Sequence, residues 1–79
     1  MKLGRIIAEG ESCIEDVEKL TKQGFKRVRN DAWLRRALRA YNNRKTEWQF
    51  YYNPETKKTV ARRITLFMGQ WWDTIWEVV

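Results

Sequence analysis

Few residues in this 79-residue sequence have the type and spacing that catalysis requires. Histidine, the commonest general base in enzymes, is absent. Asp73 and Glu77 lie four positions apart in a segment that alternates like a β-strand, so both carboxyl groups share one face but are about 13 Å apart. That separation is too long for a pair of catalytic carboxylates.

The single cysteine, Cys13, precedes a predicted helix, where the helix dipole can lower the pKa of a thiol. It has no candidate base and stands beside the apolar face of that helix, so we interpret it as structural. One cysteine without histidine leaves no ligand set for zinc, and the scattered glycines form no phosphate-binding loop. The sequence predicts no catalytic residue, no metal and no cofactor, and therefore a protein that is not an enzyme.

The positive charge is concentrated in the middle third of the chain. Residues 25–46 contain eight Lys or Arg residues and one Asp, a net charge of +7, whereas the whole chain carries +6. A segment with so few acids is typical of a surface that binds anions, and an ordinary solvated helix face is the alternative interpretation. The candidate binding residues are Lys26, Arg27, Arg29, Arg35, Arg36, Arg39, Asn43, Arg44, Lys45 and Tyr51, the last as an exposed ring for base stacking.

Nucleic acid is the partner that this pattern favours, because arginine can donate two parallel hydrogen bonds to a backbone phosphate. The alternative is a small phage or mobile-element inhibitor or adaptor that docks on an acidic surface of a partner protein, since Trp, Tyr and Arg carry most interface hot spots. A homodimer through exposed aromatic side chains is a further expectation. We expect no membrane partner, because the core needs the apolar face of the cationic helix.

Length and composition predict a single compact domain over residues 1–79. Five Trp, three Tyr and three Phe supply the large apolar area that so short a chain needs for a core. The unpaired cysteine and the lack of a signal-like or membrane-spanning apolar run predict a cytoplasmic, reducing location.

The first predicted helix spans residues 12–23. Ser12 and Glu15 have the spacing of a capping box, in which each side chain accepts a backbone N–H of the other residue. Gly24 suits the left-handed conformation that ends many helices, and Phe25 can fold back on the last turn. Residues 2–8 fit either a helical turn or an edge strand, and their β-branched residues favour the strand.

The second predicted helix spans residues 31–42 and carries the centre of the basic segment. Its apolar residues occupy one half of the helical wheel, and Arg35, Arg36 and Arg39 occupy the other. We therefore expect these three arginines to point to solvent and to form one positive patch with the flanking cations.

The last third of the sequence alternates as strands do over residues 48–52, 59–68 and 71–79. The fold predicted is α+β, with two amphipathic helices packed on one face of a small, mainly antiparallel sheet whose last three strands form a meander. A winged-helix-like fold is the alternative if residues 2–8 are helical. The side chains predicted to be largely buried are Trp48, Phe50, Ile64, Leu66, Trp72 and Trp76.

Overall fold

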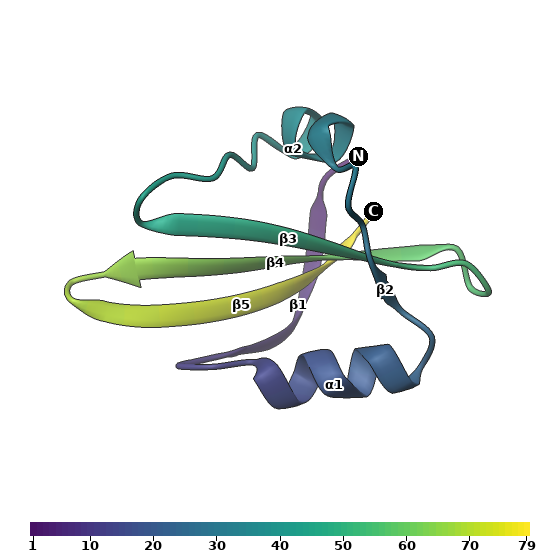
Figure 1. Cartoon of the computed structure of the whole chain (residues 1–79), viewed down its shortest axis with the longest axis horizontal. Helices are drawn as coiled ribbons and strands as arrows, with labels where there is room; N and C mark the ends of the chain where they lie inside the picture. The colour runs from purple at the N-terminus through teal and green to yellow at the C-terminus, as the bar shows by residue number, and fades with distance from the viewer.

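The computed structural model describes residues 1–79 and contains one five-stranded antiparallel sheet with two helices (Figure 1). Its elements are β1 (Leu3–Gly10), α1 (Ile14–Lys22), β2 (Lys26–Arg27), α2 (Ala32–Leu38), β3 (Thr46–Asn53), β4 (Lys58–Phe67) and β5 (Gln70–Val78). The strands lie in the order β1-β5-β4-β3-β2, so the first and last strands of the chain pair with each other. The α+β class and the C-terminal meander are confirmed. Because residues 3–10 form a strand, the winged-helix-like alternative is wrong.

Helix α1 begins at Ile14, but the predicted capping box does not form. Ser12 accepts only a long hydrogen bond, 3.4 Å, from the Ile14 N–H, and the Cys13 N–H donates instead to Asp73 Oδ2 at 2.9 Å. The cap therefore comes from β5, sixty residues away in the sequence. The end of α1 is as predicted, since Gly24 has a φ of +106° and the Phe25 N–H donates to the Leu20 carbonyl at 3.0 Å.

Helix α2 ends at Leu38, four residues before the predicted end. Arg39 adopts the left-handed conformation, with a φ of 55°, and turns the chain so that Ala40 enters the core. Beyond this turn, the side chains of two asparagines accept hydrogen bonds from backbone N–H groups that follow them in the chain. Asn42 Oδ1 accepts the Trp48 N–H at 2.6 Å, and Asn43 Oδ1 accepts the Lys45 N–H at 2.8 Å, so the chain leaves the helix and leads into β3.

The two helices pack on opposite faces of the sheet, so the prediction that both cover one face is wrong (Figure 1). Neighbouring residues of a strand point to opposite faces, and the apolar pairs 50–51, 60–61 and 75–76 contribute one residue to each. The core on the α1 face contains Cys13, Leu20, Phe25, Tyr51, Val60 and Ile75. The core on the α2 face contains Leu34, Ala40, Trp48, Phe50 and Ala61, with Trp76 packed against it.

The helices are too short to cover the sheet. Seven residues of α2 span about 10 Å and nine of α1 about 14 Å, whereas the ten residues of β4 span about 33 Å. The β4–β5 hairpin therefore extends beyond both helices (Figure 1). Neither helix is long enough, or apolar enough, to span a membrane.

This short coverage decides which of the predicted core residues are buried. Trp48 and Phe50 lie under α2 and are buried as expected. Trp76, Ile64 and Leu66 are only half-buried, and Trp72 is 39% exposed. The prediction of a largely buried set is therefore confirmed for Trp48 and Phe50. Trp76 packs against the α2-face core but stays half-buried, and the prediction is wrong toward the free end of the hairpin.

Candidate functional site

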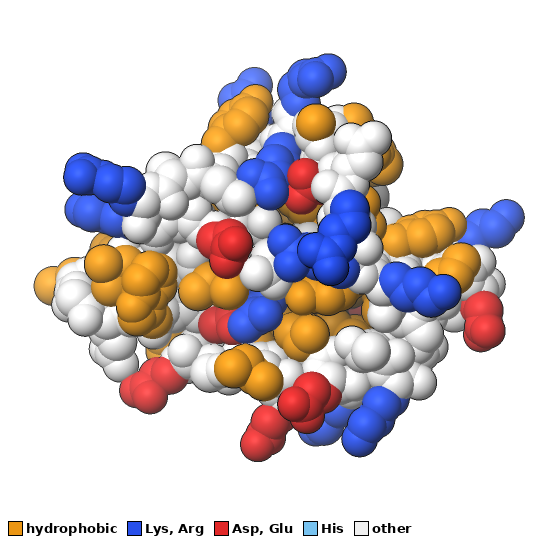
Figure 2. All heavy atoms as spheres, viewed as in Figure 1, with side chains coloured by type: hydrophobic (Ala, Val, Ile, Leu, Met, Phe, Trp, Pro, Cys, Tyr) orange, Lys and Arg blue, Asp and Glu red, His pale blue; other side chains and the backbone are white.

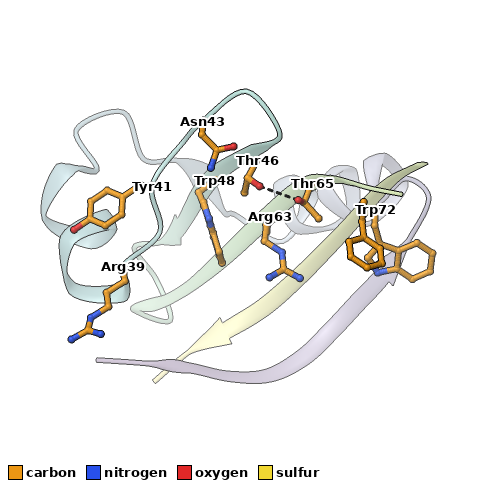
Figure 3. A pocket seen from close by; sticks show the side chains of 9 residues that line it. Arg39, Tyr41, Asn43, Thr46, Trp48, Arg63, Thr65 and Trp72 are labelled. Carbon is orange, nitrogen blue, oxygen red and sulfur yellow. Dashed lines mark hydrogen bonds between the residues drawn. The ribbon is translucent and has the colours of Figure 1, made fainter. Parts of the chain in front are cut away.

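A groove of about 700 Å³ lies on the α2 face of the sheet, beyond the end of α2 (Figure 3). Strands β3, β4 and β5 supply its floor, because the cross-strand pairs Trp48–Arg63 and Thr65–Trp72 belong to this face. The loop after α2 supplies one wall. The residues that line this α2-face groove are Arg39, Tyr41, Asn43, Thr46, Trp48, Arg63, Thr65, Phe67 and Trp72.

Arg63 lies in the floor of the groove (Figure 3). Its guanidinium carbon is 4.9 Å from the centroid of the Trp76 ring and 5.8 Å from that of Trp48. These two rings stack on each other with their centroids 5.6 Å apart. The Nε of Arg63 is buried without a hydrogen-bond partner, and no carboxylate forms an ion pair with this side chain. The two stacked tryptophans thus hold the guanidinium of Arg63 in place. Its charge is not neutralised by an acid, and its Nε–H has no hydrogen-bond acceptor.

Aromatic rings and small polar groups surround Arg63. Tyr41 is 59% exposed at one side of the groove, and Phe67 and Trp72 are exposed at the other. The hydroxyl groups of Thr46 and Thr65 are hydrogen-bonded to each other at 2.9 Å (Figure 3). No Asp or Glu lines the groove. The arrangement can therefore bind an anion at Arg63 and Arg39 and accept planar groups against the rings.

The preceding residue, Arg62, shows by contrast what a structural arginine looks like in this sheet. It points to the α1 face and donates from Nη2 to Asp73 Oδ2 at 2.6 Å and from Nε to both oxygens of that carboxylate at 3.0 Å. The hydrogen bonds to Asp73, opposed by burial, raise the pKa of Arg62. Asp73 is buried and also caps α1, so this pair is fully engaged in holding the fold together.

Three of the sequence-predicted binding residues are less accessible than expected. Arg35 forms an ion pair with Asp31 at 3.0 Å, and only 25% of its side chain is exposed. Arg27 is half-buried, with its Nε buried and unpartnered. Tyr51 is buried in the core under α1 and donates its hydroxyl proton to Gln49 Oε1 at 3.0 Å. The prediction of an exposed Tyr51 ring is wrong because a helix covers the face of β3 that was expected to be open.

The other predicted residues are exposed but do not form one patch. Figure 2 shows the Lys and Arg side chains in separate groups on the face in view. Of these residues, only Arg39 and Asn43 line the groove. The exposed residues that lie elsewhere are Lys26, Arg29, Arg36, Arg44 and Lys45. The α2 arginines therefore do not stack along one helix face, since Arg39 lies beyond the helix end and Arg35 is paired with an acid.

Sequence reasoning missed most of the groove, including Arg63, Phe67 and Trp72. The signal was present in β4, where Arg63, Thr65 and Phe67 alternate on one face with a pattern unlike that of a covered strand. This pattern can be recognised as a site only when the helix lengths are known, because a strand that is longer than the helix packed on it leaves the end of that face exposed.

The structural interpretation of Cys13 fits its surroundings. The thiol is 1% exposed and contacts the Asp73 backbone carbonyl at 3.4 Å. Burial, followed by the charge of the Asp73 carboxylate, raises the pKa of this thiol from 9.0 to about 11. A nucleophilic cysteine has the opposite shift, because the thiolate is the reactive form.

The chain was compared with protein-family models, with curated proteins and with solved structures, and it is significantly similar to none of them.

Proposed function

We propose that this protein is a non-enzymatic nucleic-acid-binding protein and that its α2-face groove binds a single strand. The observation that carries the proposal is Arg63, an unpaired cation whose guanidinium lies over two tryptophan rings in an open groove without acids. Arginine is suited to phosphate because its planar fork donates two parallel hydrogen bonds. The unpaired, buried thiol of Cys13 supports a reducing, cytoplasmic location as part of this proposal.

The exposed rings favour a single strand over a duplex as the ligand. In a duplex the base faces are stacked on one another, whereas an unpaired base can stack on Tyr41, Phe67 or Trp72. Such stacking contributes about 1–3 kcal/mol per base and tolerates any sequence, because every base has an aromatic face. Arg39 and Arg63 would then contact the backbone phosphates on either side of a stacked base.

The test is the substitution Arg63→Gln, with Lys22→Gln as the matched control. Both variants lose one positive charge, but Lys22 is exposed on α1, on the opposite side of the sheet. Binding of a fluorescent 20-nucleotide single strand would be measured by anisotropy at about 50 mM and about 200 mM salt. A hydrogen bond to a charged group contributes about 1.5–3 kcal/mol, so Arg63→Gln should weaken binding at least about tenfold.

The salt dependence makes the test specific for phosphate. Losing one phosphate contact should lower the slope of log K against log salt by about 0.7, and Lys22→Gln should leave it unchanged. Arg63→Lys keeps the charge but loses the fork and the stacking, so its affinity should lie between those of the parent and Arg63→Gln. Equal affinities of Arg63→Gln and Lys22→Gln would contradict the proposal, and so would an affinity independent of salt.

Docking on an acidic protein is the second candidate function, and a different surface favours it. Trp33 is 55% exposed on α2, one turn before the exposed Arg36, and Trp and Arg are the residues most enriched in interface hot spots. A complex with an acidic protein that Trp33→Ala and Arg36→Gln weaken, and that Arg63→Gln leaves intact, would support this candidate over the groove.

A further inference from the structure

In the turn between β4 and β5, Met68 adopts a backbone conformation that is unfavourable for a residue with a side chain. Phe67 pairs with Gln70, and the two residues between them, Met68 and Gly69, have φ values of 51° and 76°. Positive φ at both positions is the pattern of a type I′ turn, which favours Asn-Gly. Met68 has a side chain that disfavours this conformation, and it is 89% exposed, so no contact within the molecule offsets the strain.

Other large apolar side chains surround Met68 at the free end of the hairpin. Phe67 is 68% exposed and Trp71 is 50% exposed. We call Phe67, Met68 and Trp71 the hairpin tip. Figure 2 shows hydrophobic side chains gathered at this end of the molecule, with Lys or Arg side chains on one side of them and acids on the other. Exposed apolar residues that break a local rule indicate a binding surface.

The charged residues beside the hairpin tip determine on which side of it an anion can bind. The Leu66 N–H donates to the Lys45 carbonyl at 2.7 Å, so the loop with the exposed Arg44 and Lys45 lies against the end of β4. On the other side, Gln70 donates to the Glu11 carboxylate at 2.9 Å. A polyanion at the tip is therefore expected on the side of Arg44 and Lys45.

The hairpin tip is continuous with the α2-face groove. Phe67 belongs to both, and it lies four residues, or about 13 Å, beyond Arg63 along β4. A single-stranded nucleic acid that leaves the groove in the direction of β4 therefore reaches Phe67 and Met68 next. Exposed Phe and Met side chains with nearby cations are the groups that DNA-binding proteins insert between base steps.

We propose that the hairpin tip inserts beside the first base pair of a duplex whose single-stranded extension lies in the groove. The ligand class is then a nucleic acid with a junction between single and double strands. Phe67 and Met68 replace the stacking partner of the terminal pair, and Arg44 and Lys45 contact the phosphates beside it. This inference rests on the proposed function of the groove.

The test uses Met68→Asn, which removes the apolar side chain and suits the turn. The probe is a short duplex with a single-stranded extension and 2-aminopurine in the first base pair, whose fluorescence rises when the neighbouring base of the extension no longer stacks on it. The parent protein should raise this fluorescence, and Met68→Asn should not. Loss of one stacking contact should also weaken junction binding roughly tenfold, while affinity for the isolated single strand stays the same.

Two controls distinguish an error in the proposal about the tip from unfolding of the variant and from an error in the proposed function of the groove. Met68→Asn should raise Tm by roughly 4–8 °C, because it relieves the strained turn, so a lost signal cannot come from unfolding. Arg63→Gln should weaken both single-strand and junction binding, each at least about tenfold. If the parent protein binds no single strand, the proposed function fails; if it binds, and Met68→Asn raises the fluorescence as the parent does, only the inference about the tip fails. Binding to phosphatidylglycerol vesicles that Met68→Asn abolishes, without a 2-aminopurine change, would assign the tip to a lipid surface and also overturn the inference.

Discussion

Arg62 and Arg63 are adjacent in the sequence and have opposite roles, because successive side chains of a strand point to opposite faces. Arg62 is neutralised by Asp73 and hydrogen-bonded on the α1 face. Arg63 has two tryptophan rings beside it and no acid. A buried arginine that is paired has its charge and donors satisfied within the fold, and removing its acid is costly, whereas an unpaired arginine in an open groove is available to a ligand.

At the same scale, Cys13 makes a prediction about stability and pH. The folded state holds the thiol proton to about pH 11, whereas the unfolded chain releases it near the ordinary value of 9.0. The contribution of the neutral thiol is therefore complete below pH 9 and is lost between about pH 9 and pH 11. Over that range the parent should lose about 2–3 kcal/mol more unfolding free energy than Cys13→Ala, in urea titrations at each pH. Equal pH profiles would contradict this account of the thiol.

At the scale of elements, Asp73 joins β5 to the start of α1. Its carboxylate accepts the Cys13 N–H and the Arg62 guanidinium, so Asp73→Ala leaves a half-buried cation and an uncapped helix. Removing one partner of a buried pair costs about 3–5 kcal/mol, and chemical denaturation should show a loss of that size. The double variant Arg62→Met, Asp73→Ala should recover part of it. A single variant as stable as the parent would mean that the pair holds nothing together.

The sequence predicted the elements better than their arrangement. Periodicity identified α1 and the C-terminal meander, because these patterns depend on neighbours in the chain. It left residues 2–8 open between helix and strand, and their β-branched residues favoured the strand that forms there. The cap from Asp73 and the placement of the helices on two faces depend on contacts across the sheet, which periodicity does not encode. Helix α2 was predicted four residues too long because periodicity does not show that the side chains of Asn42 and Asn43 accept hydrogen bonds from the backbone that leads into β3.

The candidate site was also predicted only where it depends on local sequence and not where it depends on contacts across the sheet. The exposed cations were identified from composition, and Arg39 and Asn43 do line the groove. Tyr51 was misplaced because its face of β3 is covered by α1. Arg63 was missed because it lies over Trp48 of β3 and Trp76 of β5, and the residues around Arg63 in the sequence do not predict these contacts.

At the scale of the whole molecule, a net charge of +6 on 79 residues attracts polyanions from every direction, so affinity alone cannot locate the binding surface. The Lys and Arg side chains form separate groups on the face in view (Figure 2), and exposed rings lie near cations both in the groove and on α2, where Trp33 precedes Arg36. The central claim is therefore about place: a single strand occupies the α2-face groove rather than the outer face of α2.

The five tryptophans allow one measurement that tests this claim directly, because each indole N–H gives its own signal in a ¹H–¹⁵N correlation spectrum. A single-stranded oligonucleotide titrated into the labelled protein should shift the signals of Trp48 and Trp72, together with the Arg63 Nε–H. Trp33, on the outer face of α2, should stay unchanged. Shifts at Trp33 with the Trp48, Trp72 and Arg63 signals unmoved would contradict the account and place the ligand on α2.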